Sequence, residues 1–200
     1  MPHFNPELWR KRSWAKHQRS SLNKDEADRQ RLDDERGIAN LERIVRWCDG
    51  RGVEVVFCRR SGAVYLGQQN MIRVSDRMSP RLQAYFLLHE CGHFLVGARD
   101  KHERFGMGWH TDDERDKRTF HHRCDVVEEE FEAWYRGWRL AQRLRLDIDK
   151  GDYDRIRIKN LKTYLCWSLK VNGFSDRGVA PDVDADRFDG AGLQTGASVE

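Results

Sequence analysis

The chain has 200 residues, of which 34% are charged and 38% hydrophobic, and its formal net charge is +3. This length predicts one domain with extensions rather than two full domains, and so small a net charge does not by itself indicate a nucleic-acid partner. No stretch approaches the roughly 20 apolar residues of a membrane-spanning helix, so we expect no membrane partner.

The cysteine content favours a reducing, intracellular environment. The chain has five cysteines, an odd number, and no CxxC pair. A disulfide framework is therefore not expected. The N-terminal residues are polar and charged, without the apolar run of a signal peptide. We therefore expect a soluble, cytoplasmic protein.

The N-terminal region is basic. Residues 9–19, WRKRSWAKHQR, are rich in Lys and Arg, contain two Trp and have no acidic residue. Such a segment is typical of an arm that contacts nucleic acid or an acidic partner. It is also typical of a solvated, loosely ordered N-terminus, which is the commoner case.

The first predicted helix spans residues 24–49. Apolar side chains recur at helical spacing from Leu41 to Cys48, and Asp-Gly-Arg-Gly at 49–52 ends the helix. Gly37 lowers the helix propensity within this segment.

Three short β-strands are predicted next. The segments VEVVFC (53–58), AVYL (63–66) and MIRV (71–74) are rich in β-branched side chains and are separated by turns. Three short strands separated by turns favour a small antiparallel sheet.

A second helix is predicted over residues 80–96. Ser79 suits the N-cap, Pro80 suits the first helical position, and Gly97 suits the C-terminal end. Residues 98–123 are polar and show no periodicity, which predicts a long loop. A loop of this length in a compact domain is usually functional or disordered.

Two further helices are predicted, over residues 125–146 and 155–171. The second has four apolar residues on one face, Ile158, Leu161, Leu165 and Leu169. The elements together predict an α+β fold.

The chain is thus expected to divide into three parts. Residues 1–23 form a basic arm, residues 24–173 form the folded domain, and residues 174–200, rich in Gly and Asp, form a disordered tail.

The segment YFLLHECGHFLVG (85–97) places three polar groups in an otherwise apolar helix. His89 and His93 lie one turn apart on one helix face, so both imidazoles can bind one ion, and zinc suits such ligands. Glu90 can accept a proton from a water molecule that the metal activates and carry it to a leaving amine. The HExxH pattern therefore indicates a metal site; the simpler alternative is two buried histidines satisfied by hydrogen bonds.

The other two residues between these histidines have different expected roles. Cys91 is rotated by about 200° from His89, which predicts a packed thiol rather than a ligand. Gly92 costs a helix about 1 kcal/mol relative to Ala, so we expect another element to approach it closely.

A catalytic zinc site needs a third protein ligand. The downstream candidates are four histidines and four glutamates: His102, His110, His121, His122, Glu128, Glu129, Glu130 and Glu132.

A helical wheel selects among the glutamates. The apolar face of the 125–146 helix consists of Val127, Phe131, Trp134, Trp138 and Ala141. Glu130 falls on the edge of this face, whereas the other three glutamates point away from it and are expected to be solvated. A carboxylate that projects inward needs a partner, so Glu130 is the predicted ligand. The alternative is a salt bridge from Glu130 to an arginine at the edge of the core.

The chain resembles the ImmA/IrrE-like zinc metallopeptidases of the gluzincin group over roughly residues 40–145. The shared features are a leading helix, a small sheet, Ile-Arg-Val-Ser at 72–75, Ser-Pro-Arg at 79–81, and the HECGH helix. Members usually carry HExGH and a later E-x-E-A-(N/D) motif whose first glutamate binds zinc. The sequence EFEAW at 130–134 matches except at its last position. The resemblance implies a zincin-like minimal metallopeptidase with Zn²⁺ bound by Glu130.

One departure concerns the surroundings of the metal. Trp134 stands where the family usually has Asn or Asp, a small polar residue that orients a zinc-binding histidine. The loop before this helix is also longer than usual in the family. The resemblance further implies activity on a protein substrate, often a regulatory DNA-binding protein.

The predicted function is zinc-dependent endopeptidase activity. A further group should stabilise the negative charge on the substrate oxygen in the transition state. The sequence leaves four possible donors open: His110, His121, His122 and Tyr164. A different hypothesis is a binding or regulatory protein on the same fold, inactive or with structural zinc, whose basic arm contacts DNA or a protein. Retention of Glu90 favours the enzyme, because a structural site needs no base.

Overall fold

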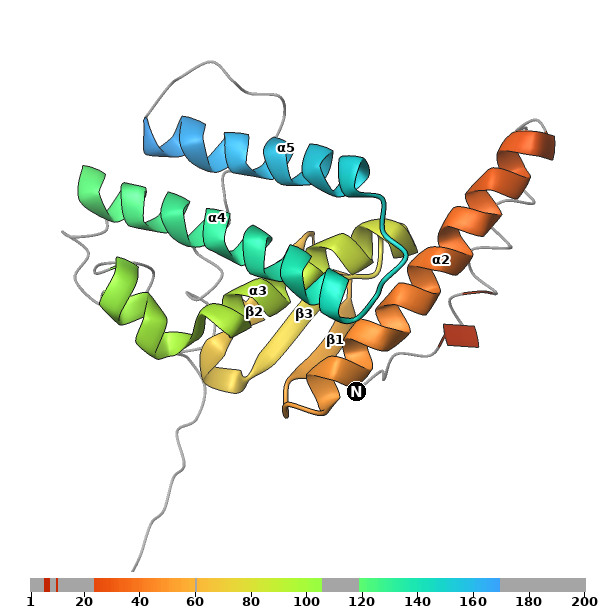
Figure 1. The fold of residues 1–200 in the computed structure, drawn as a ribbon, viewed down its shortest axis with the longest axis horizontal. Coiled ribbons are helices and arrows are strands. Elements are labelled where there is room, and N and C mark those ends of the chain that lie inside the picture. The colour runs from red at the N-terminus through yellow and green to blue at the C-terminus, as the bar shows by residue number, and fades with distance from the viewer. Residues whose placement is uncertain (1–5, 8–9, 11–23, 60, 106–118, 170–200) are drawn as a thin grey trace, which may run out of the picture.

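The computed structural model describes residues 6–7, 10, 24–59, 61–105 and 119–169. In chain order its elements are α2 (Lys24–Asp49), β1 (Glu54–Cys58), β2 (Ala63–Leu66), the 3-10 turn η1 (Gly67–Gln69), β3 (Met71–Ser75), α3 (Pro80–Phe105), α4 (Phe120–Arg143) and α5 (Lys150–Ser168). The α+β fold predicted from the sequence is confirmed (Figure 1).

The sheet is mixed, so the prediction of an antiparallel sheet is wrong for one pair of strands. The strand order is β1-β3-β2. Strand β1 runs parallel to β3, with Val55 opposite Ile72, and β2 runs antiparallel to β3, with Tyr65 opposite Ile72. A parallel pair needs a connection of about a dozen residues, and the segment 59–70, which contains β2, provides it. Strand β2 therefore lies at one edge of the sheet.

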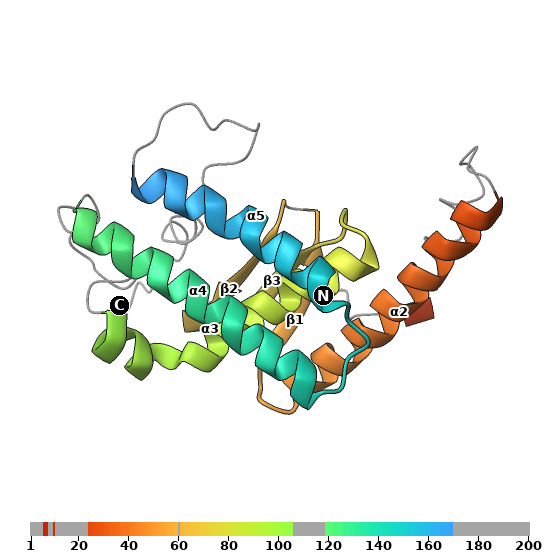
Figure 2. The ribbon, with the colours of Figure 1, turned by 45° about the horizontal axis from the view of Figure 1, so that its top comes forward.

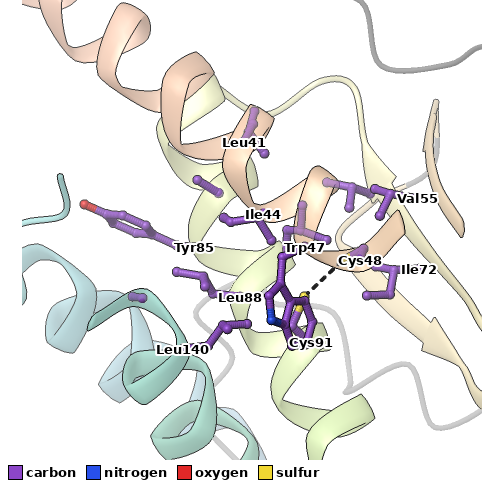
Figure 3. Packing of buried hydrophobic residues seen from close by; sticks show 14 of the residues in the cluster. Leu41, Ile44, Trp47, Cys48, Val55, Ile72, Tyr85, Leu88, Cys91 and Leu140 are labelled. Atoms are coloured by element: carbon purple, nitrogen blue, oxygen red, sulfur yellow. Dashed lines mark hydrogen bonds between the residues drawn. The ribbon is translucent and has the colours of Figure 1, made fainter. Parts of the chain in front are cut away.

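Helix α3 occupies the centre of the molecule. It contacts the sheet, α2 and α4, while α5 packs on α4 (Figures 1 and 2). Side chains from α2, α3, α4 and the sheet meet in one core, which Figure 3 illustrates with Leu41, Ile44, Trp47, Cys48, Val55, Ile72, Tyr85, Leu88, Cys91 and Leu140. Cys91 is fully buried with its Sγ 3.5 Å from Cys48 Sγ, in agreement with the predicted packed thiol.

Two glycines of the central helices bring α3 and α4 into backbone contact. A Cβ added to Gly92 would lie 1.9 Å from the carbonyl oxygen of Ala133, and one added to Gly137 would lie 2.5 Å from that of Leu88. No side chain fits at either contact, so the helices can cross this closely only with glycine there. The close approach predicted beside Gly92 is confirmed, and it brings α4 against the histidines of α3.

The helix boundaries differ from the prediction between residues 97 and 125. Gly97 has φ 69° and interrupts α3, but the chain then resumes a helix as far as Phe105, where a loop was predicted. Helix α4 begins at Phe120, because the Thr119 side chain caps it by accepting a hydrogen bond from the backbone N–H of His122. Both His121 and His122 therefore lie in the first turn of α4 rather than before it.

Helix α5 is confirmed but begins earlier than predicted. Asp149 caps it by accepting from the backbone N–H of Asp152. Of the four apolar residues expected on one face, only Leu161 is buried; the other three are exposed, Ile158, Leu165 and Leu169.

Within the described ranges, none of the helices is both long enough and apolar enough to cross a bilayer. Most of the basic segment 9–19, as well as His110 and the tail from residue 174, lies outside the residues whose placement is described. His102 belongs to the last part of α3, but its side chain is outside the description.

Candidate metal centre

The two histidines of the HExxH pattern converge inside the protein. His89 and His93 are buried on α3, one helical turn apart, and their Nε2 atoms lie 3.2 Å from each other. Because two ring nitrogens lie close to each other on one helix face, α3 supplies two of the three side chains of a possible ion-binding group.

Glu130 of α4 completes this group. Its Oε2 lies 3.2 Å from His89 Nε2 and its Oε1 lies 3.3 Å from His93 Nε2. The three side chains are buried, and their ligand atoms lie within 4.8 Å of one another. They could therefore hold a metal ion.

The alternative interpretation of Glu130 is not supported by these contacts. Its ionic partners among the described residues are the two histidines and not an arginine. The carboxylate has only 2% of its surface exposed, so its charge depends on these partners.

The electrostatics of the group follow from this burial. Burial acts to raise the pKa of Glu130, but the charges of His89 and His93 and their hydrogen bonds hold it well below its usual range. Burial acts to lower the pKa of His93, but the charge of Glu130 and the hydrogen bonds to Glu129 and Glu130 raise it to about 10. Without a metal ion, His93 therefore favours its protonated, positively charged form beside the buried carboxylate of Glu130. A bound metal cation would supply the positive charge in place of this proton.

Glu129 is a site residue that the helical wheel missed. It was expected to be solvated, but its exposed fraction is 0% and its Oε1 lies 3.0 Å from His93 Nδ1. Glu128 is exposed as predicted, and Glu132 is half-buried and pairs with Arg136 at 2.7 Å.

Glu129 was missed because the helical wheel placed the centre of the inward face of α4 at the wrong residues. Phe131 was placed on the inward face, but 43% of its surface is exposed. The residues of α4 that are in fact buried are His122, Asp125, Val126, Glu129, Glu130, Ala133, Trp134, Gly137, Leu140 and Ala141. Several of them are small, and this row of small residues marks the true inward face.

Trp134 contacts the other histidine. Its ring is fully buried and stacks on His89, with ring centroids 4.3 Å apart and an interplanar angle of 20°. His89 Nδ1 and Trp134 Nε1 are buried, and neither has a hydrogen-bond partner among the described residues. Position 134 therefore supports a histidine through ring stacking, where a smaller polar residue would use a hydrogen bond.

Glu90 lies between the histidines and the sheet. The residue is 5% exposed, and its Oε2 accepts a hydrogen bond of 2.9 Å from the backbone N–H of Tyr65. Because Tyr65 belongs to the edge strand β2, this bond ties the predicted base to the rim of the sheet.

The four possible donors have different positions. Burial raises the pKa of Tyr164, and the charges of Glu130 and Glu90 and a hydrogen bond to Glu130 raise it further, so Tyr164 of α5 lies at the site. The His121 side chain is 72% exposed and 3.9 Å from Asp125. His122 is buried, but eight residues separate it from Glu130, which is about 12 Å along the helix axis. His110 lies outside the described residues.

Comparison of the chain with protein-family models, with curated proteins and with solved structures gives no match.

Proposed function

We propose that this protein is a zinc-dependent endopeptidase. The observation that supports this function above all is the buried group of His89, His93 and Glu130 with Glu90 beside it. Two imidazoles and a carboxylate are a ligand set that catalytic zinc sites combine with a water molecule in the fourth place.

The spacing of the ligand atoms fits this ion. Zinc binds nitrogen and carboxylate oxygen at about 2.0–2.1 Å, so two ligands of a regular tetrahedron lie about 3.3 Å apart. In this site the two Nε2 atoms lie 3.2 Å apart, and each lies 3.2 or 3.3 Å from a different oxygen of Glu130. Calcium prefers six to eight oxygen ligands and magnesium an octahedron of oxygens, so two imidazoles disfavour both.

The remaining residues supply the proton transfers. Zinc, when bound, polarises the peptide carbonyl and acidifies a water molecule. Glu90 would take a proton from a water molecule and deliver it to the leaving amine. The Tyr65 N–H holds Glu90 Oε2 in place, so that Oε1 can receive the proton. The Tyr164 hydroxyl donates a hydrogen bond to the carbonyl oxygen as that oxygen gains negative charge.

The resemblance to the ImmA/IrrE-like metallopeptidases supports the same function. It rests on HECGH at 89–93 and on EFEA at 130–133, the two segments that meet at the candidate site. By this resemblance the substrate is a peptide bond in a protein, with a regulatory or DNA-bound protein as the first candidate. The basic segment 9–19 would then bring the enzyme to DNA.

The test separates metal binding from catalysis. Zinc content and hydrolysis of casein are measured for the wild type, for Glu90→Gln and for the control Glu128→Gln, which removes the same charge from an exposed position of α4. Because a positioned base contributes about 10²–10⁴-fold to such reactions, Glu90→Gln should keep one zinc ion and lose at least about a hundredfold in rate. Glu128→Gln should match the wild type in both measurements.

Two results would count against the proposal. Hydrolysis by Glu90→Gln at the wild-type rate would remove the base from its assigned role. Zinc binding without hydrolysis of casein or of candidate repressors by the wild type would favour a binding protein built on the same fold.

A further inference from the structure

His93 is held between two consecutive carboxylates of α4. Its Nδ1 lies 3.0 Å from Glu129 Oε1, and its Nε2 lies 3.3 Å from Glu130 Oε1. Neighbouring residues of a helix point about 100° apart. Glu129 and Glu130 can therefore reach the two nitrogens of one ring only if the ring lies very close to the helix. The contact between Gly92 and Ala133 provides that closeness.

This arrangement determines which nitrogen of His93 carries the proton in the neutral ring. An ionised carboxylate only accepts hydrogen bonds, so Nδ1 must donate to Glu129. The lone pair of a neutral ring is then on Nε2, which faces His89 Nε2 and Glu130. A ring with its proton on Nε2 could not bind a metal ion at that atom.

The contact with His93 Nδ1 also explains why a carboxylate is buried at position 129. The exposed fraction of Glu129 is 0%, and an ionised carboxylate is rarely buried without hydrogen-bonded partners. At position 134, where the family places a polar residue for this purpose, Trp134 stacks on His89 and offers no acceptor to either histidine.

We propose that Glu129 is the positioning residue of this site, which fixes the tautomer and the ring orientation of His93 so that Nε2 faces the metal ion. The inference deepens the proposed zinc site but does not depend on which reaction the site performs. Partners of this kind typically contribute about 10–100-fold to metal affinity.

The experiment measures zinc affinity by competition with a chromophoric chelator, without any assay of activity. Glu129→Leu replaces the carboxylate by an apolar side chain of similar size. Because removal of one partner of a buried pair destabilises a fold, the helix content of this variant is measured as well. The substitution should weaken zinc binding by about 10–100-fold. Glu129→Gln, whose amide oxygen can still accept from Nδ1, should lose less. Glu128→Gln, which removes the same charge from an exposed neighbour, should bind zinc as the wild type does.

A spectroscopic readout separates positioning from a general effect on folding. Long-range ¹H–¹⁵N correlation spectra of the zinc-loaded wild type should show the His93 proton on Nδ1. The Glu129→Leu spectrum should show a mixture of tautomers or loss of the defined Nδ1–H signal. Circular dichroism of the metal-free variants should show the wild-type helix content.

The outcomes are distinct. Wild-type zinc affinity in folded Glu129→Leu, or an Nε2-protonated His93, would overturn this assignment alone. Zinc binding without peptide hydrolysis would overturn the proposed function and leave the assignment standing. A wild type that binds neither zinc nor cobalt would overturn both.

Discussion

At the scale of single residues, the two histidines of the site are held by different forces. His93 donates to a carboxylate, while His89 lies against the flat face of Trp134 with its Nδ1 unbonded among the described residues. Stacking restricts the plane of the ring but gives no preference for either nitrogen. The orientation of His89 should therefore depend on the aromatic character of position 134.

This dependence predicts different effects for two substitutions of Trp134. Trp134→Phe keeps a ring against His89 and should bind zinc within a few-fold of the wild type. Trp134→Leu removes the ring but stays apolar, and an aromatic pair contributes about 0.5–1.5 kcal/mol beyond its buried area, so zinc affinity should fall by up to about tenfold. Chelator competition measures both.

The matched control is the same pair of substitutions at Trp138, whose ring packs on Tyr153 with ring centroids 5.3 Å apart and, among the described residues, forms no ring contact with a histidine. Equal zinc affinity for Trp134→Phe and Trp134→Leu would show that the stack does not orient His89.

The same residues show how far the sequence could predict the site. Glu130 could be selected because an inward carboxylate on an apolar helix needs a partner. Glu129 was missed because the large apolar residues placed the inward face too close to Phe131, which is 43% exposed. Close helix packing is marked by small residues such as Ala133 and Gly137, and these carry little weight in a hydrophobic pattern.

At the scale of elements, the site depends on how closely α3 and α4 cross. The histidines of one helix and the carboxylates of the other are separated by ligand distances because Gly92 lies directly against Ala133. Gly137 of α4 makes a similar contact about one helical turn further along, against Leu88 of α3. Glycine at these two positions lowers helix propensity, but it allows the two helices to cross this closely.

Gly92→Ala should therefore damage both folding and metal binding. The new Cβ would lie 1.9 Å from the carbonyl oxygen of Ala133, so the helices must move apart. Overpacking of this kind costs about 1–3 kcal/mol or more, which outweighs the gain of about 1 kcal/mol in helix propensity. Thermal denaturation should show a lower midpoint, and zinc affinity should fall with it.

Gly50→Ala provides the control, because its added Cβ would be 3.5 Å from the nearest atom, the carbonyl oxygen of Arg46. It should leave both quantities near the wild-type values. A Gly92→Ala protein as stable as the wild type would mean that the helices are not in backbone contact.

Local patterns predicted the elements better than their pairing. Helix α2 and strand β2 have their predicted boundaries, since spacing of apolar residues and turn residues are local signals. The insertion of β3 between β1 and β2 was not predicted, because strand order is decided by contacts with α2 and α3. The extension of α3 beyond Gly97 was missed for a different reason: a glycine with positive φ ends one helical segment without preventing the next.

At the scale of the whole molecule, the site is assembled from one strand and three helices. Tyr65 belongs to β2, the HExxH residues to α3, the glutamates to α4 and Tyr164 to α5. The position of α5 follows from its contacts with α3 and α4. Arg81 of α3 pairs with Asp152 at 2.9 Å, and the buried hydroxyl of Tyr153 donates to the carbonyl oxygen of Trp134 at 3.0 Å.

A second anchor fixes the connection between α4 and α5. The Asn40 side chain of α2 donates to the Asp147 carbonyl at 2.8 Å and accepts from the Asp147 N–H at 3.0 Å. These contacts join segments about a hundred residues apart in the sequence, so no local pattern could show that Tyr164 lies at the site. This is why the sequence left four donors open.

Tyr164→Phe tests whether this placement serves catalysis. The substitution removes one hydroxyl and keeps the ring, so the packing of α5 on α4 should persist. If the hydroxyl donates to the carbonyl oxygen in the transition state, its loss should lower kcat by about 10²–10³-fold and leave KM nearly unchanged. Zinc content should remain one ion per chain, because the three proposed ligands are intact.

Tyr135→Phe is the matched control, since the same hydroxyl is removed from a residue of α4 that is 51% exposed. Its kcat should equal that of the wild type. A fall in zinc affinity with unchanged kcat in Tyr164→Phe would instead assign the hydroxyl to Glu130, whose charge raises the pKa of Tyr164, and not to the substrate. In one role the hydroxyl contacts the substrate oxygen, and in the other it contacts Glu130. The kinetic constants separate the two roles, because only loss of a contact made in the transition state lowers kcat without changing the metal content.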